Sequence, residues 1–167
     1  MRRRSARPPA PPTRTSSPPS RAALKGLQLA FGDGRYAPAF STLELPKGVE
    51  VRSLAEVLKE NPTRLDGRLL VPDAPFAALN LALFNDGAWV RLAPGTLLET
   101  PIHLLFISSL HGEPYITHPR IFIEAGEGSR SVIVKSYIGP AGGTYFTNAA
   151  ATVSLGAGAV LDLTKVQ

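Results

Sequence analysis

Residues 108–119 carry the side-chain types of a hydrolase. Ser108, Ser109, His111 and Glu113 bring hydroxyl, imidazole and carboxylate groups into one short segment. A serine becomes a nucleophile when a histidine base lies within hydrogen-bond reach and a third group orients that base. Neither serine, however, lies in the Gly-x-Ser-x-Gly turn that presents such a nucleophile in α/β-hydrolases. We therefore predict no catalytic residue in this segment and expect that the chain is not an enzyme.

The three histidines do not have the spacing of a metal site. His103, His111 and His118 are separated by eight and seven residues. These spacings fit neither a helical ligand pair nor two ligands on one face of a strand. His103 alternates with apolar neighbours, so we expect its ring on the solvent-facing side of a strand, and the other two in a loop. We predict surface histidines and no metal-binding residue.

Two glycine-rich stretches could be taken for phosphate-binding loops. They are residues 126–128 and residues 139–143. A P-loop ends in Gly-Lys-Ser/Thr, and a dinucleotide site needs three spaced glycines that open a helix. Both stretches lead into strand-like runs instead, so we predict tight corners between strands and no cofactor-binding residue.

Aromatic residues offer one alternative function. Trp89, Tyr137, Tyr145 and Phe146 could form a platform on which a sugar ring stacks. Aromatic residues in strands more commonly serve packing. A small β-rich binding module, for a carbohydrate or a protein, remains the alternative to a scaffold.

The composition excludes several classes of site and partner. The 167 residues include no cysteine, which rules out disulfides and thiolate ligands within this sequence. The hydrophobic fraction is 44% and the aromatic fraction 7%, so the core must be largely aliphatic. No apolar run approaches the length of a membrane span. We expect no membrane partner and no small-molecule substrate.

The net charge of +5 is concentrated at the N-terminus. Residues 1–25 hold seven basic residues and no acidic one, whereas the remainder has 11 basic and 13 acidic residues. The folded part is therefore mildly acidic, and we expect no nucleic-acid partner. Residues 1–24 are rich in Arg, Pro and Ser, which predicts a disordered tail or an organelle transit peptide.

Residues 25–85 are predicted to form a small α/β region. Residues 27–36 read as a strand, a Gly-Asp-Gly turn and a second strand. Ser53 and Glu56 form a capping box that opens a short helix, which ends at Asn61-Pro62. A second helix is expected from about residue 74 to residue 84, capped by Asp73, with an apolar stripe at helical spacing. That stripe consists of Phe76, Leu79 and Leu83.

After Gly87 the apolar period changes from 3.6 to 2, which predicts strands. The expected strands are residues 89–92, 102–107, 121–124, 132–137, 150–155 and 160–166. An internal echo accompanies them, because Gly126 and Gly156 are thirty residues apart, as are Gly128 and Gly158. Residues 91–96 resemble an earlier copy about thirty-one residues before. Strand–glycine-turn units at a fixed period favour a coil of stacked rungs, although a β-sandwich also spaces its strands regularly.

Several motifs in a fixed order resemble the SufB/SufD family of iron–sulfur cluster assembly proteins, and within it the SufD type. Residues 99–106, Glu-Thr-Pro-Ile-His-Leu-Leu-Phe, are similar to the family pattern E-x-P-I-H-L-x-F. Residues 78–87 resemble its L-N-x-A-x-x-x-D-G pattern. The other matching stretches are residues 32–38, 51–58, 118–120, 126–129, 137–139, 146–148 and 166–167. The likeness covers residues 27–167.

The resemblance implies a non-catalytic scaffold subunit of the SUF system. It implies a mainly β fold, in which residues 86–167 begin a right-handed parallel β-helix that is truncated at Gln167. The implied partners of the full-length protein are a SufB-like homologue and a SufC-like ATPase, and the full complex assembles an iron–sulfur cluster that this fragment does not itself bind. No residue here matches a functional position of the family. The implied location is the cytoplasm, or a plastid if residues 1–24 are a transit peptide.

Overall fold

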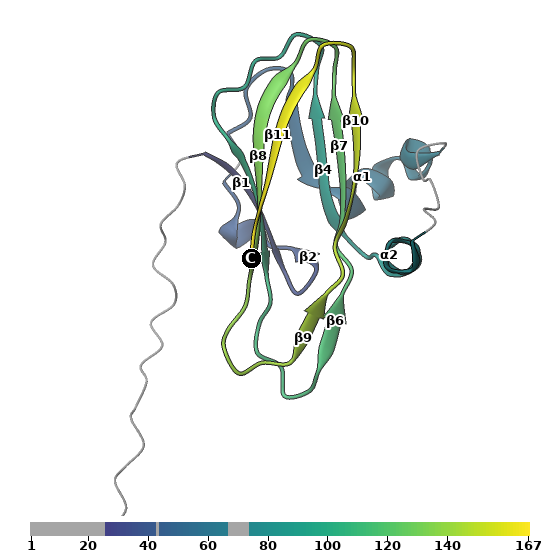
Figure 1. The fold of residues 1–167 in the computed structure, drawn as a ribbon, viewed down its shortest axis with the longest axis vertical. Helices are drawn as coiled ribbons and strands as arrows, with labels where there is room; N and C mark the ends of the chain where they lie inside the picture. Colours follow the sequence, from purple (N-terminus) through teal and green to yellow (C-terminus); the bar gives the residue numbers. More distant parts are fainter. Residues whose placement is uncertain (1–25, 43, 67–73) are drawn as a thin grey trace, which may run out of the picture.

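The computed structural model describes residues 26–42, 44–66 and 74–167. The predicted tail at residues 1–24 and the predicted helix cap Asp73 lie outside these residues. The described chain is mainly β, as expected, with two α-helices (Figure 1). The helices are α1 (Leu54–Glu60) and α2 (Pro75–Leu83). No helix of the described residues is both long and apolar enough to cross a membrane.

The strands form three sheets. The first has the order β11-β8-β5-β1-β2, the second the order β10-β7-β4-β3, and the third pairs β6 with β9. The strands of the first sheet are β1 (Leu27–Gly32), β2 (Arg35–Tyr36), β5 (Ile102–Ile107), β8 (Arg130–Ile138) and β11 (Val160–Val166). Those of the second are β3 (Val49–Ser53), β4 (Gly87–Leu92), β7 (Arg120–Ala125) and β10 (Ala150–Leu155). The third consists of β6 (Tyr115–Thr117) and β9 (Tyr145–Thr147).

From β4 onward the chain visits the three sheets in rotation, and each strand pairs in parallel with the strand of the next circuit. Arg120 of β7 is in register with Ala150 of β10, thirty residues later. Tyr115 of β6 and Tyr145 of β9 show the same offset. The thirty-residue repeat in the sequence therefore corresponds to the offset between register partners on neighbouring parallel strands. Among the described strands, the β1–β2 and β3–β4 pairs are antiparallel, so the first two sheets are mixed.

The main core lies between the first and second sheets. Alternate residues of β5 are buried, as the period of two requires, and Leu104 is fully enclosed. Ile133 of β8 and Val90 of β4 belong to the same aliphatic cluster. A second cluster forms where α1 covers the outer face of the second sheet, because Leu54 and Trp89 pack together there. In Figure 1 both helices lie on the side of the β4–β7–β10 sheet away from the first sheet.

Glycine is required where the circuits approach each other most closely. A Cβ atom on Gly126 would stand 2.6 Å from the Pro94 backbone nitrogen, and one on Gly156 would stand 2.6 Å from the Glu127 nitrogen. Gly126 and Gly156 therefore allow the turns of neighbouring circuits to stack with their backbones in close contact.

The predicted elements of residues 25–85 are largely present. β1 and β2 form the expected hairpin, with Asp33 and Gly34 at positive φ in its turn. The Ser53 hydroxyl accepts a hydrogen bond from the Glu56 amide, so the N-terminal cap of α1 is confirmed. β3 was not predicted. Because β1 pairs with β5 and β3 pairs with β4, residues on both sides of the predicted domain boundary share sheets, and the boundary itself stays a prediction.

The second helix departs from expectation in how it is oriented. The N-cap position of α2 is Ala74, and no side chain caps it. The predicted apolar stripe of Phe76, Leu79 and Leu83 is exposed, whereas Asn80 is fully buried. The Asn80 amide donates hydrogen bonds to the Pro119 and Asn148 carbonyls at 3.0 and 2.7 Å. A polar anchor, and not the apolar face, therefore sets which side of α2 meets the sheets.

Candidate functional site

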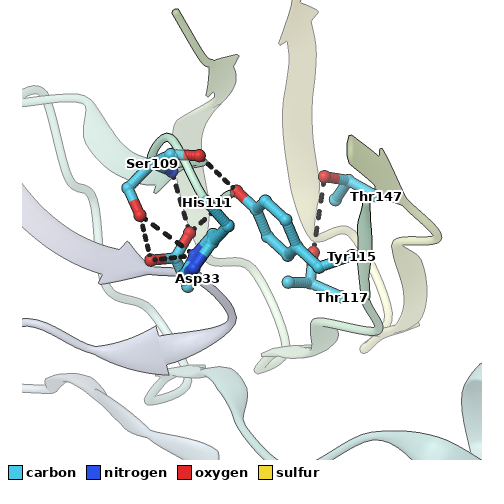
Figure 2. A network of polar contacts seen from close by, with 6 residues as sticks. All are labelled: Asp33, Ser109, His111, Tyr115, Thr117 and Thr147. Carbon is cyan, nitrogen blue, oxygen red and sulfur yellow. Dashed lines mark hydrogen bonds and ion pairs between the residues drawn. The ribbon is translucent and has the colours of Figure 1, made fainter. Parts of the chain in front are cut away.

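Two of the hydrolase-like residues, Ser109 and His111, gather around Asp33, a residue to which the sequence gave no functional role (Figure 2). Asp33 lies in the β1–β2 turn with φ 49°. Its carboxylate accepts hydrogen bonds from the Ser109 amide at 2.8 Å, from the Ser109 hydroxyl, and from the Tyr115 hydroxyl at 2.9 Å. The His111 Nε2 atom lies 3.3 Å from Asp33 Oδ2 and 3.1 Å from Ser109 Oγ. We call these four residues the Asp33 cluster.

The fold brings the Asp33 cluster together from two segments. The Asp33 amide donates to the Ile107 carbonyl at 2.8 Å, which places the hairpin turn beside the end of β5. The chain then turns through Ser109 and His111 and enters β6 at Tyr115. The His111 and Tyr115 rings pack edge to face, with centroids 4.2 Å apart. The cluster therefore ties the segment between β5 and β6 to the first hairpin.

The geometry of the Asp33 cluster is not that of a catalytic triad. In a triad, the serine contacts one histidine nitrogen and the carboxylate holds the other. Here Ser109 and Asp33 both contact the His111 Nε2 atom, and the Ser109 hydroxyl donates to the carboxylate directly. Of the four residues that suggested a hydrolase, Ser109 and His111 belong to the cluster. The arrangement is that of a loop clamp, and the absence of catalytic residues remains a prediction.

Electrostatics support the clamp interpretation. Burial raises the pKa of Asp33, but the hydrogen bonds from the Ser109 side chain and backbone, and from Tyr115 and His111, outweigh it and lower the pKa to about 2. A carboxylate that accepts several hydrogen bonds is held in its charged form. Asp33 is thus a fixed anion at neutral pH and a poor general base.

The other two histidines lie apart from this cluster. His103 is on the face opposite its apolar neighbours, as predicted, and it is partly exposed there. Its ring is half-buried and lies 3.1 Å from Gln28 Oε1 and 2.8 Å from Ser136 Oγ, because the parallel strands on each side supply polar neighbours. Burial lowers the His103 pKa. His118 lies 3.2 Å from the Asn148 amide nitrogen.

No group of three or more possible metal ligands gathers within the described residues. The glycine stretches precede β8 and β9 and not helices, as predicted. The four aromatic residues do not form the single sugar-stacking platform that was considered as an alternative. Trp89 is fully buried beneath α1, whereas Tyr145 and Phe146 are exposed on β9. Packing of the indole against Phe122, at 6.4 Å between ring centroids, accounts for the difference.

A second group of polar residues lies inside the fold, and sequence reasoning missed it. Arg120 is buried at the start of β7 and donates to Asn80 at 3.2 Å and to Thr152 at 3.1 Å. Its guanidinium lies 5.4 Å from the centroid of the Phe122 ring. Burial lowers the Arg120 pKa. Only the His-Pro-Arg motif drew attention to this residue, and a lone arginine before a strand gives no signal of burial.

A further surface is formed by the last described strand of each parallel stack. β9, β10 and β11 each have one edge without a strand partner among the described residues. Exposed strand edges are templates for pairing with further strands. This surface, which we call the open edge, also exposes large apolar side chains. They are Phe146, Val153, Leu155, Val160 and Val166.

Two curated proteins are similar to this chain. An iron–sulfur cluster assembly SufBD family protein of Synechocystis sp. is 30% identical over 114 residues, which is 66% of this chain and 25% of that protein. The iron–sulfur cluster assembly protein SufD of Escherichia coli is 28% identical over 149 residues, which is 86% of this chain and 33% of that protein. The chain therefore spans a quarter to a third of the length of these relatives. No family model matches the sequence. Both similarities support a relationship to the SufB/SufD family, without specifying SufD.

Proposed function

We propose that this chain is part of a SufD-type scaffold subunit of the SUF iron–sulfur cluster assembly system. The similarity to two proteins named for iron–sulfur cluster assembly carries the proposal, because one of those alignments extends over 86% of this chain. The motifs that resemble the SufD type lie in family order within the same residues. The chain contributes a framework and no reacting group, which agrees with the clamp geometry of the Asp33 cluster.

The proposed framework is the beginning of a right-handed parallel β-helix. Three parallel stacks with offsets near thirty residues support this fold. Parallel crossover connections are overwhelmingly right-handed. Each circuit buries its inward side chains against the next, which gives a stiff column. Residues 26–85 form the first part of this column, because β1 pairs with β5 and β3 pairs with β4.

The proposed partners are a SufB-like homologue and a SufC-like ATPase. The names of the two relatives, which both refer to iron–sulfur cluster assembly, support a role in such an assembly. The iron–sulfur cluster is the product of the whole complex and is not a resident cofactor of these residues. The proposed location is the cytoplasm, or a plastid if residues 1–24 are cleaved as a transit peptide.

Depletion of the gene product that carries this sequence tests the proposed role. The expected result is a loss of activity in enzymes that contain [4Fe–4S] clusters, with the amounts of their polypeptides unchanged, and recovery on re-expression. Depletion of a SufB-type protein in the same cells is the matched control. If that control lowers the enzyme activities and depletion of this protein does not, the proposed role is wrong.

A further inference from the structure

Helix α2 is attached to the sheets chiefly by hydrogen bonds. Asn80 is the buried residue of the helix, and its amide donates to the Pro119 and Asn148 carbonyls. The Asn148 side chain adds a bond in the other direction, because its amide nitrogen donates to the Phe76 carbonyl at 2.9 Å. A segment that buries few apolar groups opens locally at a low free energy. These polar contacts therefore decide how tightly α2 is held.

The Asn148 amide also connects α2 to His118. Asn148 is buried between β9 and β10, and its Nδ2 atom lies 3.2 Å from Nδ1 of the half-buried His118 ring. An amide nitrogen carries two hydrogens and accepts none, and the Phe76 carbonyl can only accept. Nδ2 is thus the donor in both contacts. The His118 Nδ1 atom must be the acceptor, so the ring is neutral with its proton on Nε2.

A protonated His118 cannot keep this arrangement. Both nitrogens of an imidazolium ring are donors, so the Nδ1 proton would face the Asn148 amide protons. If the amide rotated to offer its oxygen to His118, that oxygen would lie against the Phe76 carbonyl oxygen instead. Either the contact with the ring or the contact with α2 is lost. The bond that Asn148 makes to the helix is therefore compatible with a neutral His118 alone.

The charges around His118 do not decide this outcome by themselves. Asp33, with the rest of its cluster, and Arg35 line the same small cavity as the His118 ring. Arg120 is two residues further along the chain, and its amide donates to the Asp86 carbonyl. Within the described residues, α2 and the two residues between β9 and β10 bring no charged side chain. Two carboxylates and two guanidinium groups balance, and the pattern of hydrogen bonds remains as the determinant.

We propose that His118 and Asn148 form a pH-sensitive latch, which holds α2 when His118 is neutral and loosens it when His118 is protonated. The stabilisation of the docked helix is complete above about pH 7.5 and is lost as the pH falls through the range in which an exposed imidazole takes up a proton, about pH 6.5. Full exclusion of the proton from the docked state raises the opening constant of α2 about tenfold between about pH 7.5 and 5.5.

Opening of the latch has a chemical consequence for the second sheet. Arg120 is buried against Asn80 of α2, to which its guanidinium donates at 3.2 Å, and its Nε atom has no hydrogen-bond partner. Loosening of the helix uncovers this cation. The latch lies on the outer flank of the second sheet (Figure 1), so further circuits beyond β10 leave its contacts in place, and it stands independently of the proposed scaffold role.

Hydrogen exchange of the full gene product at about pH 7.5 and 5.5 tests the latch. After correction for the intrinsic exchange rate of each amide, protection in α2 is expected to fall several-fold, and by at most about tenfold, at the lower pH. Protection in β5 is expected to stay unchanged. His118→Gln keeps an acceptor oxygen and does not titrate, so it should abolish the pH dependence in α2. His103→Gln, at another half-buried histidine, is the matched control and should retain it.

Several results would overturn the proposal. They are equal corrected protection of α2 at both pH values in the wild type, an equal loss in α2 and β5, a pH dependence that persists in His118→Gln, and one that vanishes equally in His103→Gln. If His118→Gln fails to melt cooperatively, the nitrogen chemical shifts of the wild-type His118 ring decide. The latch requires Nδ1 without a proton at neutral pH, and a proton on Nδ1 contradicts it.

Discussion

The Ser53 hydroxyl donates a hydrogen bond to the buried Asp86 carboxylate, with 2.8 Å between the oxygens. The same carboxylate oxygen accepts from the Ala55 and Gly87 amides at 3.0 and 2.7 Å, and the other accepts from the Tyr36 amide at 2.8 Å. Asp86 thereby joins the first hairpin, the start of α1 and the start of β4. A single carboxylate positions the N-terminal elements against the parallel stacks.

Replacement of Asp86 by alanine is expected to destabilise the protein by about 2–4 kcal/mol. The substitution leaves backbone donors and the Ser53 hydroxyl without an acceptor, and each unsatisfied buried group costs about 1–3 kcal/mol before relaxation or water entry. Urea unfolding followed by circular dichroism measures the change. Asp66→Ala, at an exposed position, is the control and should change stability by less than about 0.5 kcal/mol. Equal effects of the two substitutions would show that Asp86 has no organising role.

The elements that sequence could predict are those with strong local signals. The N-terminal cap at Ser53, the hairpin turn and the strands with strict alternation, such as β5, lie where they were expected. β6 and β9 were missed because three residues are too few to show a period. The burial of Asn80 was missed for another reason. Its partners are the Pro119 and Asn148 carbonyls, far along the chain, and an amide on a helix is ordinarily exposed.

The site chemistry was predictable only in part. Ser109 and His111 drew attention by their types, but the residue that organises them, Asp33, lies 76 residues before Ser109. Its place in a Gly-Asp-Gly turn predicted a hairpin residue, but it gave no indication that distant side chains would hydrogen-bond to its carboxylate.

Stability between pH 2 and pH 4 is expected to depend on Asp33. Its pKa in the folded protein is about 2, below the ordinary value of 3.8, so the carboxylate stabilises the fold fully above pH 4. That contribution is lost as the pH falls from about 4 to about 2. Asp33→Asn should therefore flatten the dependence of the free energy of unfolding on pH in this window.

Urea titrations at several pH values measure this effect. Asp66→Asn serves as the control and should keep the wild-type slope. A direct check is the NMR titration of the Asp33 carboxyl carbon, whose midpoint is expected near pH 2. A midpoint near 3.8 would mean that the Asp33 cluster is not formed in solution.

Gly126→Ala is expected to destabilise the stack by about 1–3 kcal/mol. The added Cβ would stand 2.6 Å from the Pro94 nitrogen, which belongs to the backbone of the neighbouring corner and cannot rotate away. Gly112→Ala is the matched control, since a Cβ there meets no atom within 4 Å and the position is exposed. Thermal unfolding of both variants gives the comparison. A melting temperature of Gly126→Ala at or above that of Gly112→Ala contradicts the close stacking of the corners.

Asn80→Leu is expected to loosen α2 from the sheets. The change removes the donor to two carbonyls and the acceptor for Arg120, while leucine remains a good helix former. The predicted cost is about 2–4 kcal/mol, with faster amide hydrogen exchange in α2 than in β5. Asn85→Leu, on an exposed position beyond the helix, controls for the change in side chain. Unchanged exchange in α2 would show that the helix is held by other contacts.

Co-purification tests the proposed scaffold role most directly. The tagged gene product that carries this sequence is isolated in low salt with reductant present, and the proteins that accompany it are identified by mass spectrometry. We expect SufB-like and SufC-like proteins in stoichiometric amounts. Recovery of this protein without either of them, under conditions in which a tagged SufB-type protein of the same cells retains its SufC-type partner, would contradict the scaffold role.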